Sequence, residues 1–254
     1  QNLTQPESVV LRQVFETFQP HYAYNLHDQR TIFGAGESGY PATVSFLAPA
    51  FNENRDMNET RIKAIDVIVA MNTCLQKVIP NQVGRFDDGF NLNCIGDTFQ
   101  SLNVPTILFE AGHFQNDYER EQTRKFIFMA LLSGINYLNE NDVVSNKIDD
   151  YLKIPQNKVV FYDFVYKNVK INYDGNEKIV NFAAQYKEVL KDNKVGFEAR
   201  IAQIDHLENY FGHVTVNARG EAYQDNESGF PNIEQKANFS LGKNIKIVNG
   251  LINN

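Results

Sequence analysis

Two side chains that can do chemistry together, His27 and Glu110, each stand near the end of a strand-like run. Residues 104 to 112, Val-Pro-Thr-Ile-Leu-Phe-Glu-Ala-Gly, form a short apolar run of the kind that is buried on both faces of a parallel sheet. Residues 22 to 30, Tyr-Ala-Tyr-Asn-Leu-His-Asp-Gln-Arg, form a second run. Because the carboxyl ends of parallel strands share one edge of a sheet, we expect His27 and Glu110 to meet in one cleft.

A histidine and a glutamate are the parts of a zinc hydrolase, in which an imidazole binds the metal and a carboxylate takes a proton from water. One histidine is not enough, because a catalytic zinc usually has three protein ligands. His113 is a further candidate, although it would point beyond the strand end. A serine or cysteine nucleophile is disfavoured, since the chain has no Gly-x-Ser-x-Gly sequence. The alternative is that Glu110 simply points into water.

Charged residues near these two positions are candidates for binding and support. Arg30 and Arg85 can each pair with a substrate carboxylate, because a guanidinium forms two parallel hydrogen bonds with a carboxyl group. A surface salt bridge is the alternative for both. Asp28 can orient a neighbouring metal ligand or Arg30, or it can cap a turn. The pair Asp87-Asp88 can hold a cation, but acidic residues beside a glycine are also typical of turns.

Alternating helical and strand patterns must position these residues. Apolar spacing predicts a helix that Thr4 caps and Pro20 ends, a helix from Asn58 to Ile79, and a third from residue 116 or 117 to about residue 139. Residues 93 to 102 predict a short helix before the Glu110 strand. The glycine-rich residues 31 to 40 have dinucleotide-loop spacing, but a strand-like run follows instead of a helix, so we expect a mobile loop. From residue 159, short alternating runs predict a β-rich module.

Composition excludes several classes of function. The chain has 254 residues and a net charge of −7, which argues against a nucleic-acid surface. No apolar run reaches the roughly 18 to 20 residues that a membrane helix needs, so we expect no membrane partner. Cys74 and Cys94 are expected to be buried thiols in helical contexts rather than a disulfide or a metal pair. So few cysteines slightly favour the cytoplasm but leave localisation open.

The sequence Asn25-Leu26-His27-Asp28-Gln29, followed by residues 96 to 102 and 107 to 112, resembles the C-terminal half of a zinc carboxypeptidase. In that family a histidine at a strand end is the third zinc ligand, and a glutamate at a later strand end is the general base before a long helix. The resemblance assigns these roles to His27 and Glu110. It implies Zn²⁺ as cofactor and a peptide or an acylated amino acid as substrate, and it covers roughly residues 1 to 140.

The chain also departs from the family pattern. It has no His-x-x-Glu for the other two zinc ligands, and its only Asn-Arg pair, Asn54-Arg55, comes after His27 instead of before it. Phe86 and Phe90 stand where the family has a substrate-gating tyrosine. The opening residues Gln1 to Ser8 resemble the segment that family members carry directly after their Asn-Arg pair. We therefore expect a fragment that lacks two zinc ligands and is inactive alone.

Together these patterns predict an α/β protein. Residues 1 to 148 are expected to form a three-layer αβα domain with a mixed sheet, the C-terminal part of a zinc-carboxypeptidase-like catalytic domain. Residues 149 to 254 are expected to form a β-rich accessory domain. The function expected from the resemblance is zinc-dependent hydrolysis of peptide or amide bonds. The alternatives are an N-acyl amino acid deacylase of the same superfamily and a non-catalytic binding module that uses the same cleft or the β-rich tail.

Overall fold

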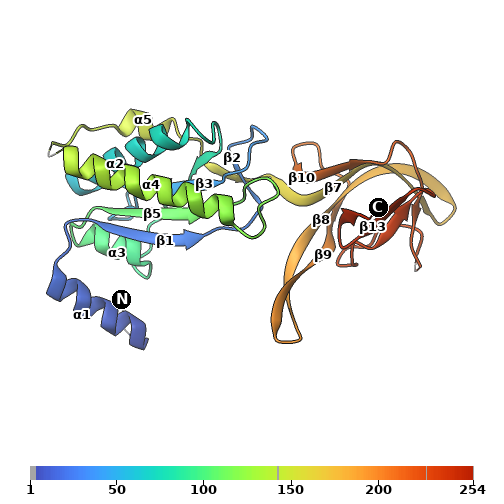
Figure 1. Cartoon of the computed structure of the whole chain (residues 1–254), viewed down its shortest axis with the longest axis horizontal. Helices are drawn as coiled ribbons and strands as arrows, with labels where there is room; N and C mark the ends of the chain where they lie inside the picture. Colours follow the sequence, from blue (N-terminus) through green and yellow to red (C-terminus); the bar gives the residue numbers. More distant parts are fainter. Residues whose placement is uncertain (1–3, 142, 227, 254) are drawn as a thin grey trace. The chain divides into compact units, whose positions relative to one another are not determined.

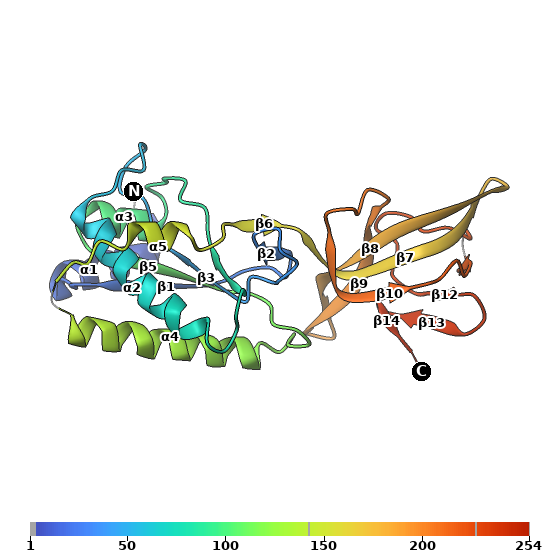
Figure 2. The ribbon, with the colours of Figure 1, turned by 90° about the horizontal axis from the view of Figure 1, so that it is seen from above.

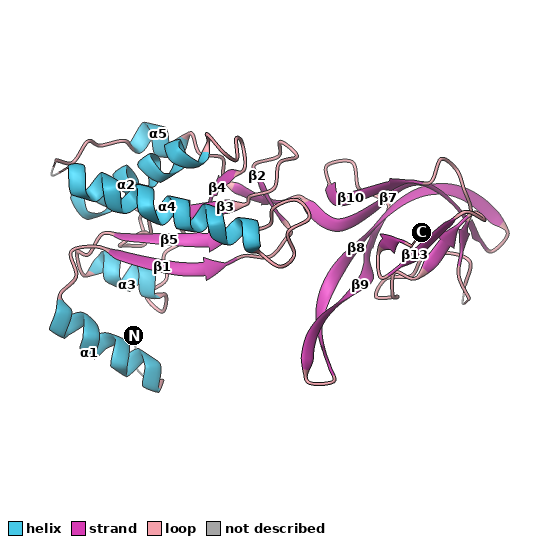
Figure 3. Ribbon diagram, in the orientation of Figure 1, coloured by secondary structure: helices cyan, strands magenta, loops and turns pink. Residues whose placement is uncertain are grey.

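The computed structural model describes residues 4–141, 143–226 and 228–253, so the first three residues of the opening run lie outside the described ranges. The chain forms two compact units, unit 1 (Gln1–Lys158) and unit 2 (Val159–Asn254). The division lies ten residues beyond the expected one at 148, because Tyr151 is buried in the core of unit 1 and Ile154 packs there too. Figure 3 shows helices in unit 1, whereas the described elements of unit 2 are strands.

The elements of unit 1 alternate along the chain as the sequence predicts (Figure 1). Its described helices are α1 (Pro6–Phe18), α2 (Glu59–Leu75), α3 (Ile95–Ser101), α4 (Glu121–Glu140) and α5 (Ile148–Leu152). Its strands are β1 (Ala23–Asp28), β2 (Phe33–Ala35), β3 (Val44–Leu47), β4 (Val83–Arg85) and β5 (Thr106–Ala111), and β6 (Asn157–Val159) spans the boundary. None of the described helices is long and apolar enough to cross a membrane.

The main sheet of unit 1 has the strand order β1-β5-β3-β4. Strand β1 is parallel to β5, and β3 is antiparallel to β5 and parallel to β4. The prediction of a mixed α/β architecture is therefore confirmed. One consequence is that the carboxyl ends of β1 and β5 meet the amino end of β3. A second, two-stranded sheet pairs β2 with β6, which Figure 2 shows side by side.

The two faces of the main sheet carry different helices. Tyr24, Phe46 and Phe109 lie on one face, where the Phe109 ring contacts both others with centroids 5.2 and 5.1 Å away. Gly134 of α4 packs directly against Tyr24, and its lack of a side chain permits this close approach. On the other face, Gly96 of α3 lies against Asn25. Residues that alternate along β1 therefore face α4 or α3 in turn.

Helix α1 differs from expectation at both its cap and its apolar face. Its N-cap is Gln5 rather than Thr4, and no side chain caps it. Phe15 packs on Phe99 of α3 with ring centroids 4.4 Å apart. Most of the predicted apolar face is solvent-exposed, namely Val9, Val10, Val14 and Phe18, of which Phe18 is 78% exposed. The apolar spacing correctly predicts a helix. It does not show whether other described residues cover the apolar face of that helix.

Unit 2 is made of two four-stranded sheets, with strand orders β10-β7-β8-β9 and β11-β12-β13-β14. The strands are β7 (Phe161–Tyr173), β8 (Asn176–Lys191), β9 (Lys194–Ile204), β10 (Phe211–Asn217), β11 (Tyr223–Gln224), β12 (Phe239–Leu241), β13 (Ile245–Val248) and β14 (Leu251–Ile252). Tyr166, Phe182 and Phe239 form its aromatic centre, and their rings lie within 5.4 Å of one another. The β-rich pattern thus corresponds to a unit with its own core.

Candidate active site at the carboxyl ends of β1 and β5

Strand register places His27 and Glu110 side by side. His27 pairs with Glu110 across β1 and β5, Glu110 pairs with Ser45 of β3, and Ser45 pairs with Gly84 of β4. Directly paired residues point to the same face of a sheet, so these four positions form one row across the four strands. The row lies on the face that carries α3, because Asn25, two residues before His27, lies against Gly96 of that helix.

Glu110 is the buried member of the row. Its side chain is only 6% exposed at the carboxyl end of β5. Burial, with a smaller contribution from the negative charge of Asp28, raises the pKa of Glu110 to about 7. A carboxyl group with this pKa takes up and releases protons near neutral pH, which a general base or acid requires.

His27 is the exposed member of the row. Its Nε2 lies 3.0 Å from Oδ1 of Asn25 on the same face of β1. Because the amide oxygen only accepts hydrogen bonds, Nε2 is the donor in this contact, and Nδ1 keeps its lone pair in the neutral ring. The imidazole can therefore bind a cation or accept a hydrogen bond through Nδ1.

Arg120 joins the ends of the two strands that carry His27 and Glu110. Its guanidinium donates to the carbonyl oxygens of Ala111 (2.8 Å) and Gly112 after β5 and to that of Gln29 (3.0 Å) after β1. The backbone N–H of Gln29 also donates to Ala111 O at 2.9 Å. The two strand ends are thus held together beyond the regular sheet hydrogen bonds.

A buried amide network lies beside the row. Gln29 donates through Nε2 to Ala42 O (2.7 Å) and Ser45 Oγ (3.1 Å). Asn157 donates through Nδ2 to Gln29 Oε1 and Ser45 Oγ, both at 2.9 Å. Gln29 is 5% exposed and Ser45 is fully buried. The network links the turn after β1, the start of β3 and strand β6.

Sequence reasoning names other site residues that the structure places differently. Arg85 pairs with Phe46, so it faces α2 and α4 rather than the row, and its guanidinium lies 5.4 Å from the Tyr151 ring centroid. Arg30 is exposed one residue after the network. Asp28 alternates away from His27 onto the α4 face, yet its charge still acts on Glu110. The structure therefore brings His27 and Glu110 together and separates Arg85 from them.

The hollow that borders His27 is not the expected common cleft, because Glu110 does not line it. It has a volume of about 450 Å³, and its other walls are mostly apolar, with Leu26, Phe109 and Phe128 among them, together with Arg124. His113, the further candidate ligand, is 2% exposed and lies against Tyr118 with ring centroids 4.7 Å apart. Burial beside an aromatic ring makes it a packed residue after β5.

The described residues do not contain a complete metal site. Over residues 4–141, 143–226 and 228–253, no three histidine, cysteine, aspartate or glutamate side chains gather closely enough to hold a metal ion. Cys74 and Cys94 are both free thiols; Cys74 is half-buried, whereas Cys94 is exposed at the N-cap of α3 rather than buried in a helix. His27 and Glu110 alone therefore do not fit a tightly held zinc ion.

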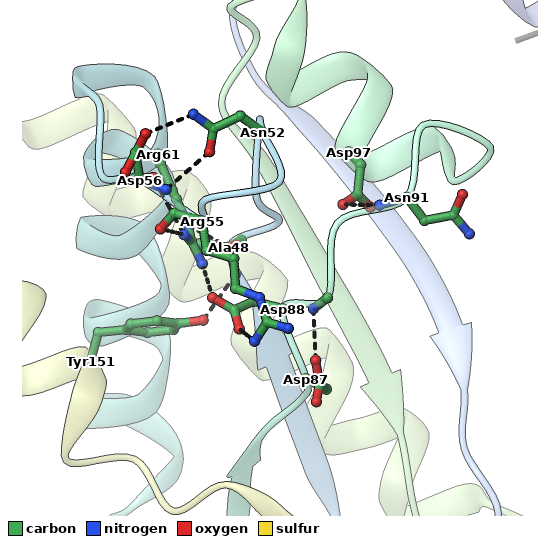
Figure 4. Close-up of polar contacts among 11 residues, drawn as sticks. Ala48, Asn52, Arg55, Asp56, Arg61, Asp87, Asp88, Asn91, Asp97 and Tyr151 are labelled. Atoms are coloured by element: carbon green, nitrogen blue, oxygen red, sulfur yellow. Dashed lines mark hydrogen bonds and ion pairs between the residues drawn. The ribbon is translucent and has the colours of Figure 1, made fainter.

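A second polar cluster lies around Arg61 of α2 (Figure 4). Arg61 is fully buried, pairs with Asp88 at 2.5 Å and donates to the carbonyl oxygens of Ala48 and Arg55. Asp88 also pairs with Arg55 at 3.2 Å. The carboxylate of Asp88 is thus paired with two guanidinium groups of unit 1, which makes the cluster a structural anchor. The alternative of a cation bound by Asp87-Asp88 therefore has no support.

Ser45, Arg120 and Asn157 contribute to the site region but have no assigned role in the sequence analysis. Ser45 lies within an apolar run, Arg120 stands in a charged helix start and Asn157 stands after the predicted catalytic segment. Their relevance arises from register and from contacts between distant segments, which local patterns do not encode. The only local signal is Gln29, as part of the His-Asp-Gln sequence.

Comparison of the chain with models of known protein families, with curated proteins and with solved structures finds no match in any of the three.

Proposed function

We propose that the row containing His27 and Glu110 is part of the active centre of a zinc-carboxypeptidase-like hydrolase of peptide or amide bonds. The observation that carries this proposal is the in-register pairing of an exposed imidazole with a buried carboxyl group at the carboxyl ends of two parallel strands. The resemblance of the surrounding sequence to zinc carboxypeptidases and the helices on both sheet faces support an αβα catalytic domain of that kind.

Glu110 is proposed as the general base. Its pKa of about 7 leaves about half of the molecules with an ionised carboxylate at neutral pH, ready to remove a proton from a water molecule. The protonated form can then return the proton to the leaving amine. This role depends on burial, because contact with bulk water would return the pKa of the Glu110 carboxyl group towards its ordinary value.

His27 is proposed as one ligand of a zinc ion through Nδ1, whose lone pair the Asn25 contact leaves available. When bound, zinc lowers the pKa of a coordinated water and polarises a carbonyl group. Since the described residues do not form a complete zinc site, the proposal requires further ligands that these residues do not supply. The proposed substrates are peptides or acylated amino acids, and exposed Arg30 is the remaining candidate to bind their carboxylate.

Zinc titration and amide hydrolysis together test this function. His27→Ala should weaken zinc binding by about tenfold or more, measured by competition with a fluorescent chelator at pH 7.5. Glu110→Gln should leave zinc binding in place and remove any zinc-dependent hydrolysis of a blocked dipeptide. His213→Ala, which removes a histidine from unit 2, is the matched control. Zinc binding that is equal in the His27 variant and the parent would exclude the ligand role.

A further inference from the structure

Gln29 joins the end of the His27 strand both to β5 and to β3. It follows His27 by two positions, and its backbone N–H donates to Ala111 next to Glu110. Its side chain donates to Ser45, the partner of Glu110 on the other side of the row. Gln29 therefore contacts both β5, which carries the Glu110 carboxyl group, and β3, which lies beside β5. Gln29 itself is buried.

Two glycines give this amide network its space. A Cβ atom at Gly84 would lie 1.9 Å from Oδ1 of Asn157 and 2.9 Å from Oγ of Ser45. A Cβ atom at Gly112 would lie 1.9 Å from the carbonyl oxygen of Ala42 and 2.6 Å from Nε2 of Gln29. Any larger residue at either position would displace the amides. Glycine at these two positions, one in β4 and one directly after β5, thus permits the close approach of backbone and side chains.

The network also restrains the amide of Gln29 in one orientation. Its nitrogen donates to Ala42 and Ser45, and its oxygen accepts from Asn157. Both ends of the carboxamide are therefore engaged, and rotation would break several hydrogen bonds at once. A group held in this way can fix the strand end that carries His27 relative to Glu110.

We propose that Gln29, held by Ser45 and Asn157, is a positioning residue that sets the distance and orientation between the His27 and Glu110 side chains. Its importance for catalysis rests on the proposed function, but the positioning itself is a property of the folded chain. Gln29 touches no reacting group; it acts through the strand end on which His27 stands. Catalytic groups need placement to within a fraction of an ångström, which buried supporting hydrogen bonds provide.

An engineered metal chelate measures this positioning without relying on activity. Glu110→His places two imidazoles at paired positions on adjacent strands, so the variant should bind Ni²⁺ about tenfold or more tightly than the parent chain. Adding Gln29→Ala to that variant should weaken Ni²⁺ binding by about tenfold, because the strand end that carries His27 is then less firmly placed relative to residue 110. Binding is measured by isothermal titration on the folded chain of 254 residues.

Gln100→Ala is the matched control in the same Glu110→His background. Gln100 is also fully buried, and its Oε1 accepts from the N–H of Thr106 at the other end of β5. This substitution should lower stability without changing Ni²⁺ affinity. If Gln29→Ala does not fold, Asn157→Ala replaces it, since it removes the partner of the Gln29 oxygen and leaves that residue in place.

The outcomes separate positioning from mere stabilisation. Weaker Ni²⁺ binding with Gln29→Ala or Asn157→Ala, but not with Gln100→Ala, supports the proposal. Unchanged Ni²⁺ affinity in the folded Gln29 and Asn157 variants overturns it, and so does an equal loss with Gln100→Ala. Because no zinc and no hydrolysis enter this measurement, failure of the proposed function would show in the zinc experiments and leave this result intact.

Discussion

At the scale of single residues, the main chemical feature is the buried carboxyl group of Glu110. Glu110 has neighbours that remove water from it, and the nearest charge acting on it, Asp28, is also negative. Its environment therefore opposes ionisation by both routes. Such an arrangement costs stability at high pH and is typical of a functional group rather than of a structural one.

Glu110 gives unit 1 a pH dependence of known sign. The folded-state pKa of about 7 lies above the ordinary value of 4.5, so the folded state binds more protons than the unfolded state between these values. Stability should therefore fall as pH rises from 4.5 through 7. Glu110→Gln should remove this component and stabilise the protein at pH 8 by about 3 kcal/mol, while changing little at pH 4. Urea unfolding of parent and variant at both pH values measures it, and a smaller effect at pH 8 than at pH 4 would contradict it.

The pairing of Arg61 with Asp88 predicts that loss of Asp88 destabilises the protein far more than loss of the adjacent Asp87. Burial alone would raise the pKa of Asp88, but hydrogen bonding and the charge of Arg61 hold it below its usual range. Asp88→Ala leaves fully buried Arg61 without its counter-ion and should destabilise the protein by about 3 kcal/mol. Asp87→Ala is the control, because Asp87 is exposed and, among the described residues, accepts a hydrogen bond only from the N–H of Gly89. Equal midpoints of urea unfolding for Asp88→Ala and Asp87→Ala would refute the structural role of the Arg61–Asp88 pair.

At the scale of elements, one carboxylate connects α2 to the segment before α5. Asp66 accepts from the backbone N–H groups of Ser145 (2.6 Å), Asn146 (3.2 Å) and Lys147 (2.8 Å). It is 3% exposed, so losing it leaves three donors without their acceptor. The contact fixes the approach of α5 to the core of unit 1.

Asp66→Ala should therefore loosen a segment distant in sequence. Amide hydrogen exchange at Ser145 and Lys147 should accelerate by about tenfold or more, because their buried acceptor is lost. Asp66→Asn, which keeps one acceptor oxygen, should show a smaller effect. Exchange rates measured by NMR decide the question, and protection that is unchanged in the alanine variant would show that α5 is held by other contacts.

Local patterns predict the longer elements of unit 1, α1 to α4 with β1, β3 and β5, but they do not predict the short elements β2, β4 and α5. Asn58 caps α2 as expected and accepts from Arg61 N at 2.9 Å. A strand rather than a helix follows the glycine-rich residues 31 to 40, but the expectation of a mobile loop there is wrong, because they contain strand β2, which pairs with β6. Strand β8 has no strong local signal, because its exposed face carries lysine and glutamate and its register shifts between Ala183 and Ala184. The sequence predicts that β1 and β5 place His27 beside Glu110, but it contains no local sign of the network with Asn157.

The arginine assignments show the same limit. A guanidinium near a strand end looks suited to bind a carboxylate, and Arg85 fits that description in sequence. Its face of the sheet depends on the register between β3 and β4, which pairs it with Phe46. Because a shift by one residue reverses the face, side-chain direction needs register as well as strand position.

At the scale of the molecule, the two units have separate hydrophobic cores. Residues of unit 1 cluster around α2 and the main sheet, and those of unit 2 cluster around Tyr166 and Phe182. A unit with its own core can fold alone. Residues 1–158 and 159–254, produced separately, should each give dispersed NMR spectra that superimpose on the corresponding signals of the whole chain. A collapsed, undispersed spectrum for either piece would show that its core depends on the other.

The hydrogen bond between Gln29 and Asn157 can form only late in the synthesis of the chain. The two residues are 128 positions apart, so the second amide leaves the ribosome long after the first. Strands β1, β3, β4 and β5 are all synthesised before Asn157, whereas the hydrogen bonds that close the amide network must wait for it. A nascent chain halted before this residue would lack the hydrogen bonds that Asn157 makes to Gln29 and Ser45, so synthesis itself delays the completion of the amide network.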